Sequence, residues 1–154
     1  PGTTTALYED KIKAYKLFAN KLWNITRFVL ENIEDMPTDR VTDTESDAAR
    51  REELRSVTHE VTQDIENYRF YMAGEKLYHY VWGTFADTII EESKPLLKGE
   101  DMHARASRQA LLVDILRTSV SLLHPFMPFI TEAVWKHLPG NDGTLLLVSP
   151  WPTL

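Results

Sequence analysis

Basic and amide side chains recur at intervals of three or four residues near the start of the chain. In an α-helix of about 3.6 residues per turn, such positions fall within roughly 80° of one another. Lysine and arginine on one face could bind phosphates, and asparagine could pair with base edges. We call this set the basic–amide stripe; it consists of Lys13, Lys16, Asn20, Asn24 and Arg27.

Aromatic side chains flank the basic–amide stripe, Trp23 at one edge and Phe28 at the other. A ring beside basic groups can stack on an unpaired base, so the pattern favours RNA contact. A plainer interpretation is also open, because every helix of a bundle needs a polar face and these residue types are common there. Spacing alone does not decide between the two.

His124 is the other residue whose setting suggests chemistry, within the stretch LLHPFMPFITEAVW (122–135). Its immediate neighbours are apolar, and the two prolines explain the segment without catalysis. Pro125 ends one helix, and Pro128 suits the first turn of the next. We therefore expect a structural imidazole that bonds a backbone carbonyl at a packed corner between two helices.

Motifs for metals, phosphates and covalent catalysis are missing from the sequence. The absence of cysteine excludes disulfides and thiolate sites. The histidines show no HxxxH or HExxH spacing, and neither GxxxxGK[ST] nor GxGxxG occurs. We predict no catalytic residue, no metal site and no cofactor site within this chain.

The net charge of −6 argues against a protein that coats nucleic acid, since phosphate binding favours a positive surface. The charges are unevenly placed. Residues 1–40 hold six Lys or Arg against six Asp or Glu, whereas the remaining 114 residues hold 11 against 17. The acidic excess therefore lies after residue 40, beyond the basic–amide stripe.

Apolar residues at helical spacing predict helices along most of the chain. Residues 34–47 are expected to form a polar linker, and residues 139–154 an extended tail packed on the helices. We expect an all-α antiparallel bundle of about five helices, in a single domain spanning residues 1–154. The helices are expected at Thr4–Asn32, Ser46–Asn67, Tyr68–Leu97, Asp101–His124 and Pro128–Leu138.

The spacing also predicts which side chains are buried. On the first helix the expected core face is Tyr8, Ile12, Tyr15, Ala19, Leu22, Thr26, Val29 and Ile33. On the third it is Phe70, Ala73, Leu77, Val81, Phe85 and Ile89. Gly74 and Gly83 are expected where a neighbouring helix approaches closely, and Pro95 with Gly99 is expected to end the third helix.

No apolar run approaches the roughly 18 residues that a membrane-spanning helix needs. The N-terminus, PGTTTALYEDK, lacks the shape of a signal peptide, and together with the absence of cysteine this favours a cytoplasmic protein. The chain has no initiator Met, so we expect a domain excised from a longer protein. A monomer is the expected state.

Three motifs in this order carry a resemblance: FANKLWNITRFVL (18–30), ENYRFYMAGEKLYHYVWGTFADTIIEESKPLL (66–97) and LLHPFMPFITEAVW (122–135), with Trp151-Pro152 near the end. They resemble the anticodon-binding helical bundle of the class I aminoacyl-tRNA synthetases for valine, isoleucine, leucine and methionine. The valine enzymes match best. The resemblance covers nearly the whole chain.

The resemblance implies a domain that binds the anticodon stem-loop of valine tRNA. The catalytic domain of such a protein attaches valine with ATP and Mg, and its HIGH and KMSKS motifs are absent here. We therefore expect this chain to bind RNA without catalysing a reaction. The implied partners are the tRNA and the catalytic and editing domains of the same protein.

Carried over residue by residue, the resemblance implies that Asn20, Lys21, Asn24, Arg27 and Phe28 face the anticodon loop. Lys13 and Lys16 complete the seven candidate RNA-binding residues. Family members commonly have Arg-Asn at the positions of Lys16-Leu17. Lys16 keeps the positive charge but lacks the planar guanidinium that suits bidentate contacts.

Two alternatives remain open. One is the same module of an isoleucine or leucine enzyme. The other is a helical protein-interaction domain without RNA binding, in which Trp23 and Phe28 would be buried. A free-standing enzyme is the weakest interpretation, since the sequence offers no nucleophile, metal or cofactor motif.

Overall fold

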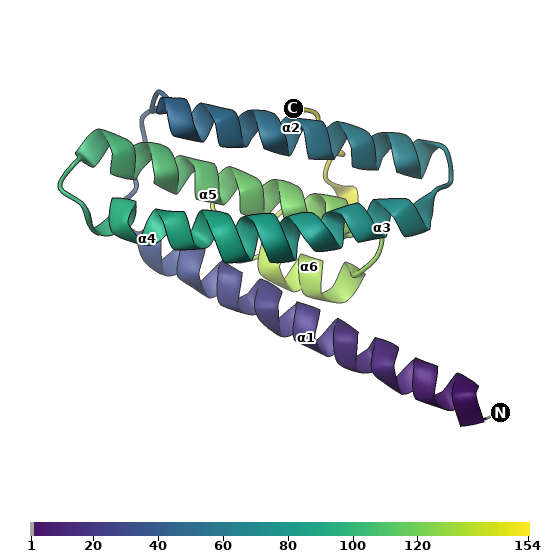
Figure 1. The fold of residues 1–154 in the computed structure, drawn as a ribbon. Coiled ribbons are helices and arrows are strands. Elements are labelled where there is room, and N and C mark those ends of the chain that lie inside the picture. The colour runs from purple at the N-terminus through teal and green to yellow at the C-terminus, as the bar shows by residue number, and fades with distance from the viewer. Residues whose placement is uncertain (1) are drawn as a thin grey trace.

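The computed structural model, which describes residues 2–154 and the side chains from Asp10 onward, is a bundle of packed helices (Figure 1). No strand occurs among residues 2–154, which confirms the all-α prediction. All five predicted helices form, with ends shifted by a few residues. The elements are α1 (Gly2–Asn32), α2 (Glu45–Glu66), α3 (Phe70–His79), the π-helix η1 (Tyr80–Ile89), α4 (Ile90–Lys98), α5 (Met102–Leu123), α6 (Pro128–Trp135) and the 3₁₀ turn η2 (Leu146–Val148).

Helix α5 runs through the middle of the bundle and is buried on almost every side. It packs against α1, α2, α3, α4 and α6. Its consecutive side chains Leu111, Leu112 and Val113 are all buried, and successive residues point about 100° apart around a helix. The Asp101 side chain begins this helix as predicted, accepting a hydrogen bond from the Ala104 N–H at 3.0 Å.

Helix α1 packs on the bundle only through its second half. Leu22 and Val29 are fully buried, whereas Ile12 and Tyr15 are 41% and 45% exposed. Figure 1 shows the reason: the N-terminal turns of α1 extend past the end of the other helices. The predicted core face was therefore wrong at Ile12 and Tyr15, and Tyr8 lies outside the described side chains.

The segment predicted as the third helix is continuous, but its middle is a π-helix. The Ile90 N–H donates to the Phe85 carbonyl, five residues back, and the Thr88 hydroxyl donates to the Gly83 carbonyl at 3.2 Å. The segment begins at Phe70 rather than Tyr68, because Tyr68 adopts a left-handed conformation with φ 58° in the turn after α2.

The predicted core line of this segment is buried from Ala73 to Ile89. Phe70 is an exception at 50% exposed, because it lies in the first turn of α3 at the end of the bundle. Pro95 does not end the helix, which continues to Lys98 and buries Leu97 against the core. The burial of Leu97 offsets the backbone hydrogen bond that proline cannot donate.

The surroundings of the two helical glycines, Gly74 and Gly83, differ from the predicted close approach of a neighbouring helix. A Cβ on Gly74 would lie 3.5 Å from the Phe126 ring, so the close neighbour there is the corner between α5 and α6. A Cβ on Gly83 would meet no atom within 4 Å, so no close approach of a helix requires glycine at this position.

A buried ion pair joins three helices at one end of the bundle. The Arg108 guanidinium on α5 donates to Asp47 Oδ1 at 2.7 and 2.8 Å, and both side chains are 1% exposed. Arg108 also donates to the Ser93 hydroxyl of α4 at 3.0 Å, and the Ser107 hydroxyl donates to Asp47 Oδ2 at 2.6 Å. Thr44, at the end of the linker, caps α2 by accepting from the Asp47 N–H.

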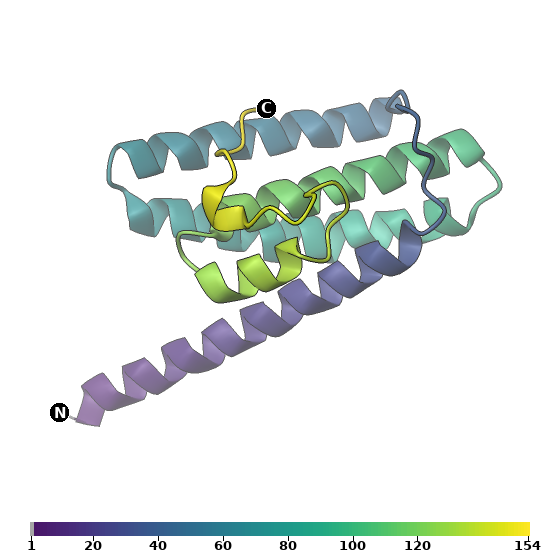
Figure 2. The same cartoon turned by 180° about the vertical axis from the view of Figure 1, so that it is seen from behind.

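The linker and the tail are held by specific contacts. Asp35 accepts from Arg105 at 2.6 Å and from Gln109 at 2.8 Å, and these bonds lower the pKa of its carboxyl, Gln109 contributing most. Figure 2 shows the tail crossing α5 toward α2. The Trp151 indole N–H donates there to the Thr62 hydroxyl at 2.8 Å. The tail is not wholly extended, since it includes the turn η2.

We predict that Asp47→Ala destabilises the domain by about 3–5 kcal/mol, because it leaves the Arg108 guanidinium buried without a counter-charge. Urea unfolding followed by circular dichroism would measure this. The control is Glu52→Ala, which breaks the exposed pair between Glu52 and Arg55 and should cost under about 0.5 kcal/mol. Equal losses in the two variants would show that the buried pair has no special role.

We predict that Gly83→Ala stabilises the domain by about 0.5–1 kcal/mol, because alanine restricts the unfolded chain and the added methyl meets open space. Gly140→Ala is the contrasting change, since Gly140 has φ +76° and alanine would be strained there. Thermal unfolding would compare the two variants. A loss of stability in Gly83→Ala would mean that η1 requires glycine for its geometry.

Candidate nucleic-acid interface

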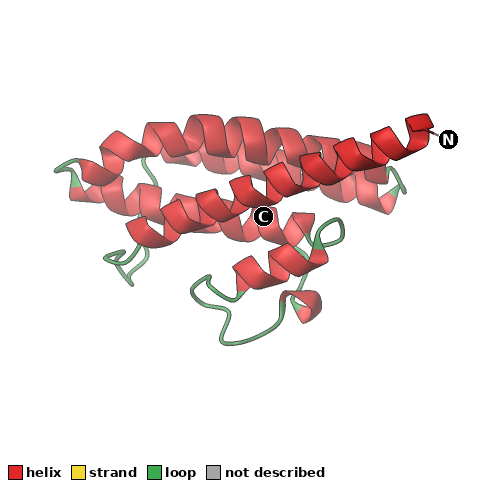
Figure 3. Ribbon diagram, turned by 90° about the horizontal axis from the view of Figure 1, so that it is seen from below, coloured by secondary structure: helices red, strands yellow, loops and turns green. Residues whose placement is uncertain are grey.

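The basic–amide stripe lies on the outer face of α1. All five of its side chains are exposed, and none forms an ion pair or side-chain hydrogen bond with a described side chain of residues 10–154. The opposite face of the helix carries the buried residues Phe18, Leu22, Ile25 and Val29. Seen from below, α1 crosses the front of the bundle with no helix over its outer side (Figure 3). The packing of α1 therefore leaves the stripe open to a ligand.

Lys21 and Phe28, the other two candidates, lie at the boundary between α1 and the bundle. The Lys21 ammonium is 2.8 Å from Asp87 Oδ1 on η1 and 4.8 Å from the centre of the Trp82 ring. Phe28 is half-buried and packs against the core. Both side chains hold α1 in place, and their contact with RNA stays a prediction.

The aromatic edge of the stripe extends onto the end of α6. Trp23 is 36% exposed, and its ring lies edge-on to His137, with ring centres 6.0 Å apart. His137 itself is exposed just past the last residue of α6. Sequence reasoning considered His137 only as a metal ligand. Its position beside Trp23 depends on the packing of α1 on α6, and no local pattern signals it.

Three positive charges, on Lys13, Lys16 and Arg27, lie along the outer face of α1. Their positions span about 21 Å of helix at about 1.5 Å per residue. Asn20 and Asn24 lie between them and carry both donors and acceptors. Such a face can contact a phosphate backbone and hydrogen-bond to bases at once, but three charges support only weak, salt-sensitive binding.

His124 is a structural residue, as the sequence predicted, although its partner differs. Its Nδ1 lies 2.9 Å from the Thr131 hydroxyl rather than from a carbonyl. The Thr131 hydroxyl donates its proton to the Met127 carbonyl at 2.7 Å, so Nδ1–H of His124 is the donor. The bond closes the corner between α5 and α6.

A family of known domains matches most of the chain. The family described as "Anticodon-binding domain of tRNA ligase" matches residues 47–154. The chain belongs to this family. The matched residues include every helix except α1, so the basic–amide stripe lies outside them.

Relatives of this anticodon-binding domain align along the whole chain, α1 included. Valine–tRNA ligase of Bacillus cereus is 37% identical over 158 residues, which cover 100% of this chain and 18% of that protein. The ligase of the same name from Thermotoga maritima is 43% identical over 144 residues, covering 92% of this chain and 16% of its own. That of Clostridium acetobutylicum is 36% identical over 157 residues, covering 99% and 18%. The anticodon-binding domain thus spans less than a fifth of these relatives.

No helix within residues 2–154 of the anticodon-binding domain is long and apolar enough to cross a membrane.

Proposed function

We propose that this chain binds the anticodon stem-loop of valine tRNA, as the tRNA-recognition module of a valine–tRNA ligase. The observation that carries the proposal is the open basic–amide stripe on α1, in a domain of the anticodon-binding family. The valine–tRNA ligases that match this chain align over α1 as well, which supports the choice of valine.

The basic and the amide side chains of the stripe have different roles in this proposal. Lys13, Lys16 and Arg27 attract the phosphates of the loop and set its position, while Asn20 and Asn24 pair with base edges. Trp23 offers a partly exposed ring beside them for stacking. The second half of α1 is anchored along its inner face, so the backbone at Asn20, Asn24 and Arg27 is fixed before RNA binds. Binding still has to order the exposed Lys and Arg side chains, which lowers the affinity.

The chemical step belongs to the longer protein in this proposal. A catalytic domain elsewhere in that chain joins valine to tRNA using ATP and Mg, with an editing domain beside it. This module contributes selective binding, so that the correct tRNA reaches that site. We propose that it works in the cytoplasm as part of a monomeric enzyme.

A protein-interaction domain is the second candidate. In such a domain the outer face of α1 would contact only solvent, and Trp23 and Phe28 would be buried. Phe28 is half-buried, as that second candidate requires, but Trp23 is 36% exposed beside the basic groups of the stripe. The position of Trp23 favours RNA binding.

We predict that the double change Lys16→Ala with Arg27→Ala weakens binding of a valine anticodon stem-loop by about tenfold or more. It should also lower the slope of log affinity against log salt by about 1 for each lost phosphate contact. Fluorescence anisotropy at low salt measures both quantities. The matched control is Arg55→Ala with Lys98→Ala, which removes two exposed charges from α2 and α4.

An equal loss in the control double variant would contradict a site on α1 and indicate attraction by overall charge. A stem-loop with altered anticodon bases tests the selectivity. If it bound as tightly as the valine stem-loop, this domain would hold phosphates without reading the anticodon.

A further inference from the structure

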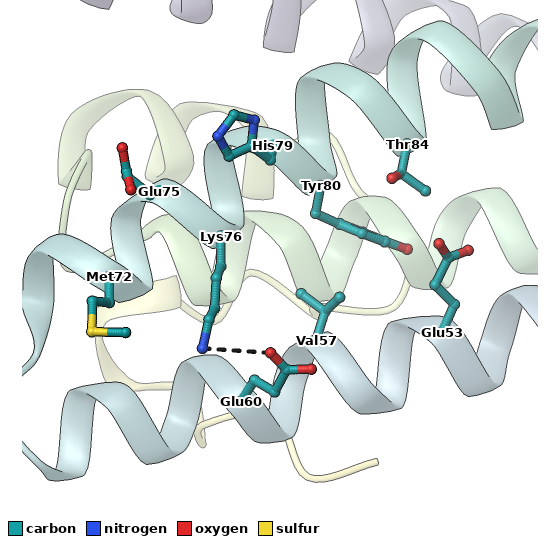
Figure 4. A pocket seen from close by; sticks show the side chains of 9 residues that line it. All are labelled: Glu53, Val57, Glu60, Met72, Glu75, Lys76, His79, Tyr80 and Thr84. Carbon is teal, nitrogen blue, oxygen red and sulfur yellow. Dashed lines mark ion pairs between the residues drawn. The ribbon is translucent and has the colours of Figure 1, made fainter.

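A groove of about 380 Å³ lies between α2 and the continuous segment of α3 and η1 (Figure 4). It is on the other side of α3 from α1, so it is separate from the basic–amide stripe. Its lining is mostly acidic and apolar. The residues that line it are Glu53, Val57, Glu60, Met72, Glu75, Lys76, His79, Tyr80 and Thr84.

The Tyr80 hydroxyl is the unusual group in this groove. Tyr80 is the first residue of η1 and is only 5% exposed, and its Oη has no hydrogen-bond partner among the described residues. Figure 4 shows the ring directed along the groove toward Glu53. Burial, followed by the charge of Glu53, raises the pKa of Tyr80, so the hydroxyl stays protonated at neutral pH. A buried hydroxyl of this kind is normally satisfied by a partner.

The groove already accommodates one ammonium group. The Lys76 Nζ lies 2.7 Å from Asp64 Oδ2 and 3.4 Å from Glu60 Oε2, between α2 and α3. Of the residues that line the groove, three are carboxylates and only Lys76 is cationic. Arg50 pairs with Glu53 at 3.0 Å but is shared with Glu92 at 2.8 Å. Negative charge therefore remains in excess in the groove.

The spacing of the carboxylates favours an extended cation over a metal ion. No three metal-ligating side chains converge among the described residues. Glu53 and Glu60 are seven residues apart on α2, which separates them by about 10 Å along the helix. Val57 and Met72 provide apolar surface between these positions. A chain of methylenes with an ammonium at each end matches this alternation of charge and apolar surface.

We propose that the groove binds a linear aliphatic polyamine. One ammonium donates to Tyr80 Oη and to the Glu53 carboxylate. The methylenes pack on Val57 and Met72, and the second ammonium contacts Glu60. The proposal is independent of tRNA binding, because it uses α2, α3 and η1 rather than α1.

The test is calorimetric titration of this chain with spermidine in the absence of RNA, at fixed ionic strength. Tyr80→Phe and Glu53→Gln should each weaken binding by about tenfold, since each removes a hydrogen bond to a charged group. Glu66→Gln, which neutralises an exposed carboxylate at the end of α2, should leave binding unchanged. Tyr80→Phe keeps the ring, and its thermal unfolding confirms that the variant is folded.

Two results would overturn the proposal. The first is equal binding of spermidine by Tyr80→Phe and the unaltered chain, which would mean that the bound cation does not contact the hydroxyl. The second is an equal loss of spermidine affinity in all three variants. A titration with MgCl2 at matched ionic strength that gave the same heat as spermidine would count in the same way. Either form of the second result would indicate general screening of a chain with net charge −6.

Discussion

The ion pair between Arg108 and Asp47 is the constraint on which the arrangement of the helices depends. Taking two charges out of water is costly, and the cost is offset only when both are fully bonded. Here Ser93 and Ser107 complete the bonding, so one polar network joins α2, α4 and α5. Few other packings of these helices would satisfy every group, which favours a single arrangement. The linker residue Thr44 is part of this network, so the path from α1 to α2 is set as well.

The position of α1 follows from this arrangement of α2, α4 and α5. Its C-terminal end is tied to α5 where Gln109 donates to the Asn32 carbonyl, and its middle is tied to η1 through Lys21 and Asp87. With its apolar face on the bundle, the basic–amide stripe can only face outward. A net acidic protein can thus present one basic face, and the acidic groove between α2 and α3 lies apart from it. Separation of the two faces keeps repulsion between RNA and the carboxylates small.

Local patterns were enough to predict the helices and the start of one of them at Asp101, because periodicity and capping act within a few residues. The corner at His124 was predicted for the same reason. The π-helix was missed, because it is a local change in hydrogen bonding inside a segment whose apolar spacing predicts one continuous helix. The exposure of Ile12 and Phe70 was not predicted, because tertiary packing determines where the bundle ends. In the candidate site, the basic–amide stripe could be predicted from local spacing. The contact between Lys21 and Asp87 could not, because it joins residues 66 apart in sequence.

The proposed function requires that RNA contacts the outer face of α1. The most direct measurement is to map backbone amide shifts by NMR while a valine anticodon stem-loop is added at low salt. We expect shifts confined to the exposed positions of residues 13–27 and to the end of α6 near His137. Shifts centred on α2 and α3, or none at millimolar RNA, would contradict it.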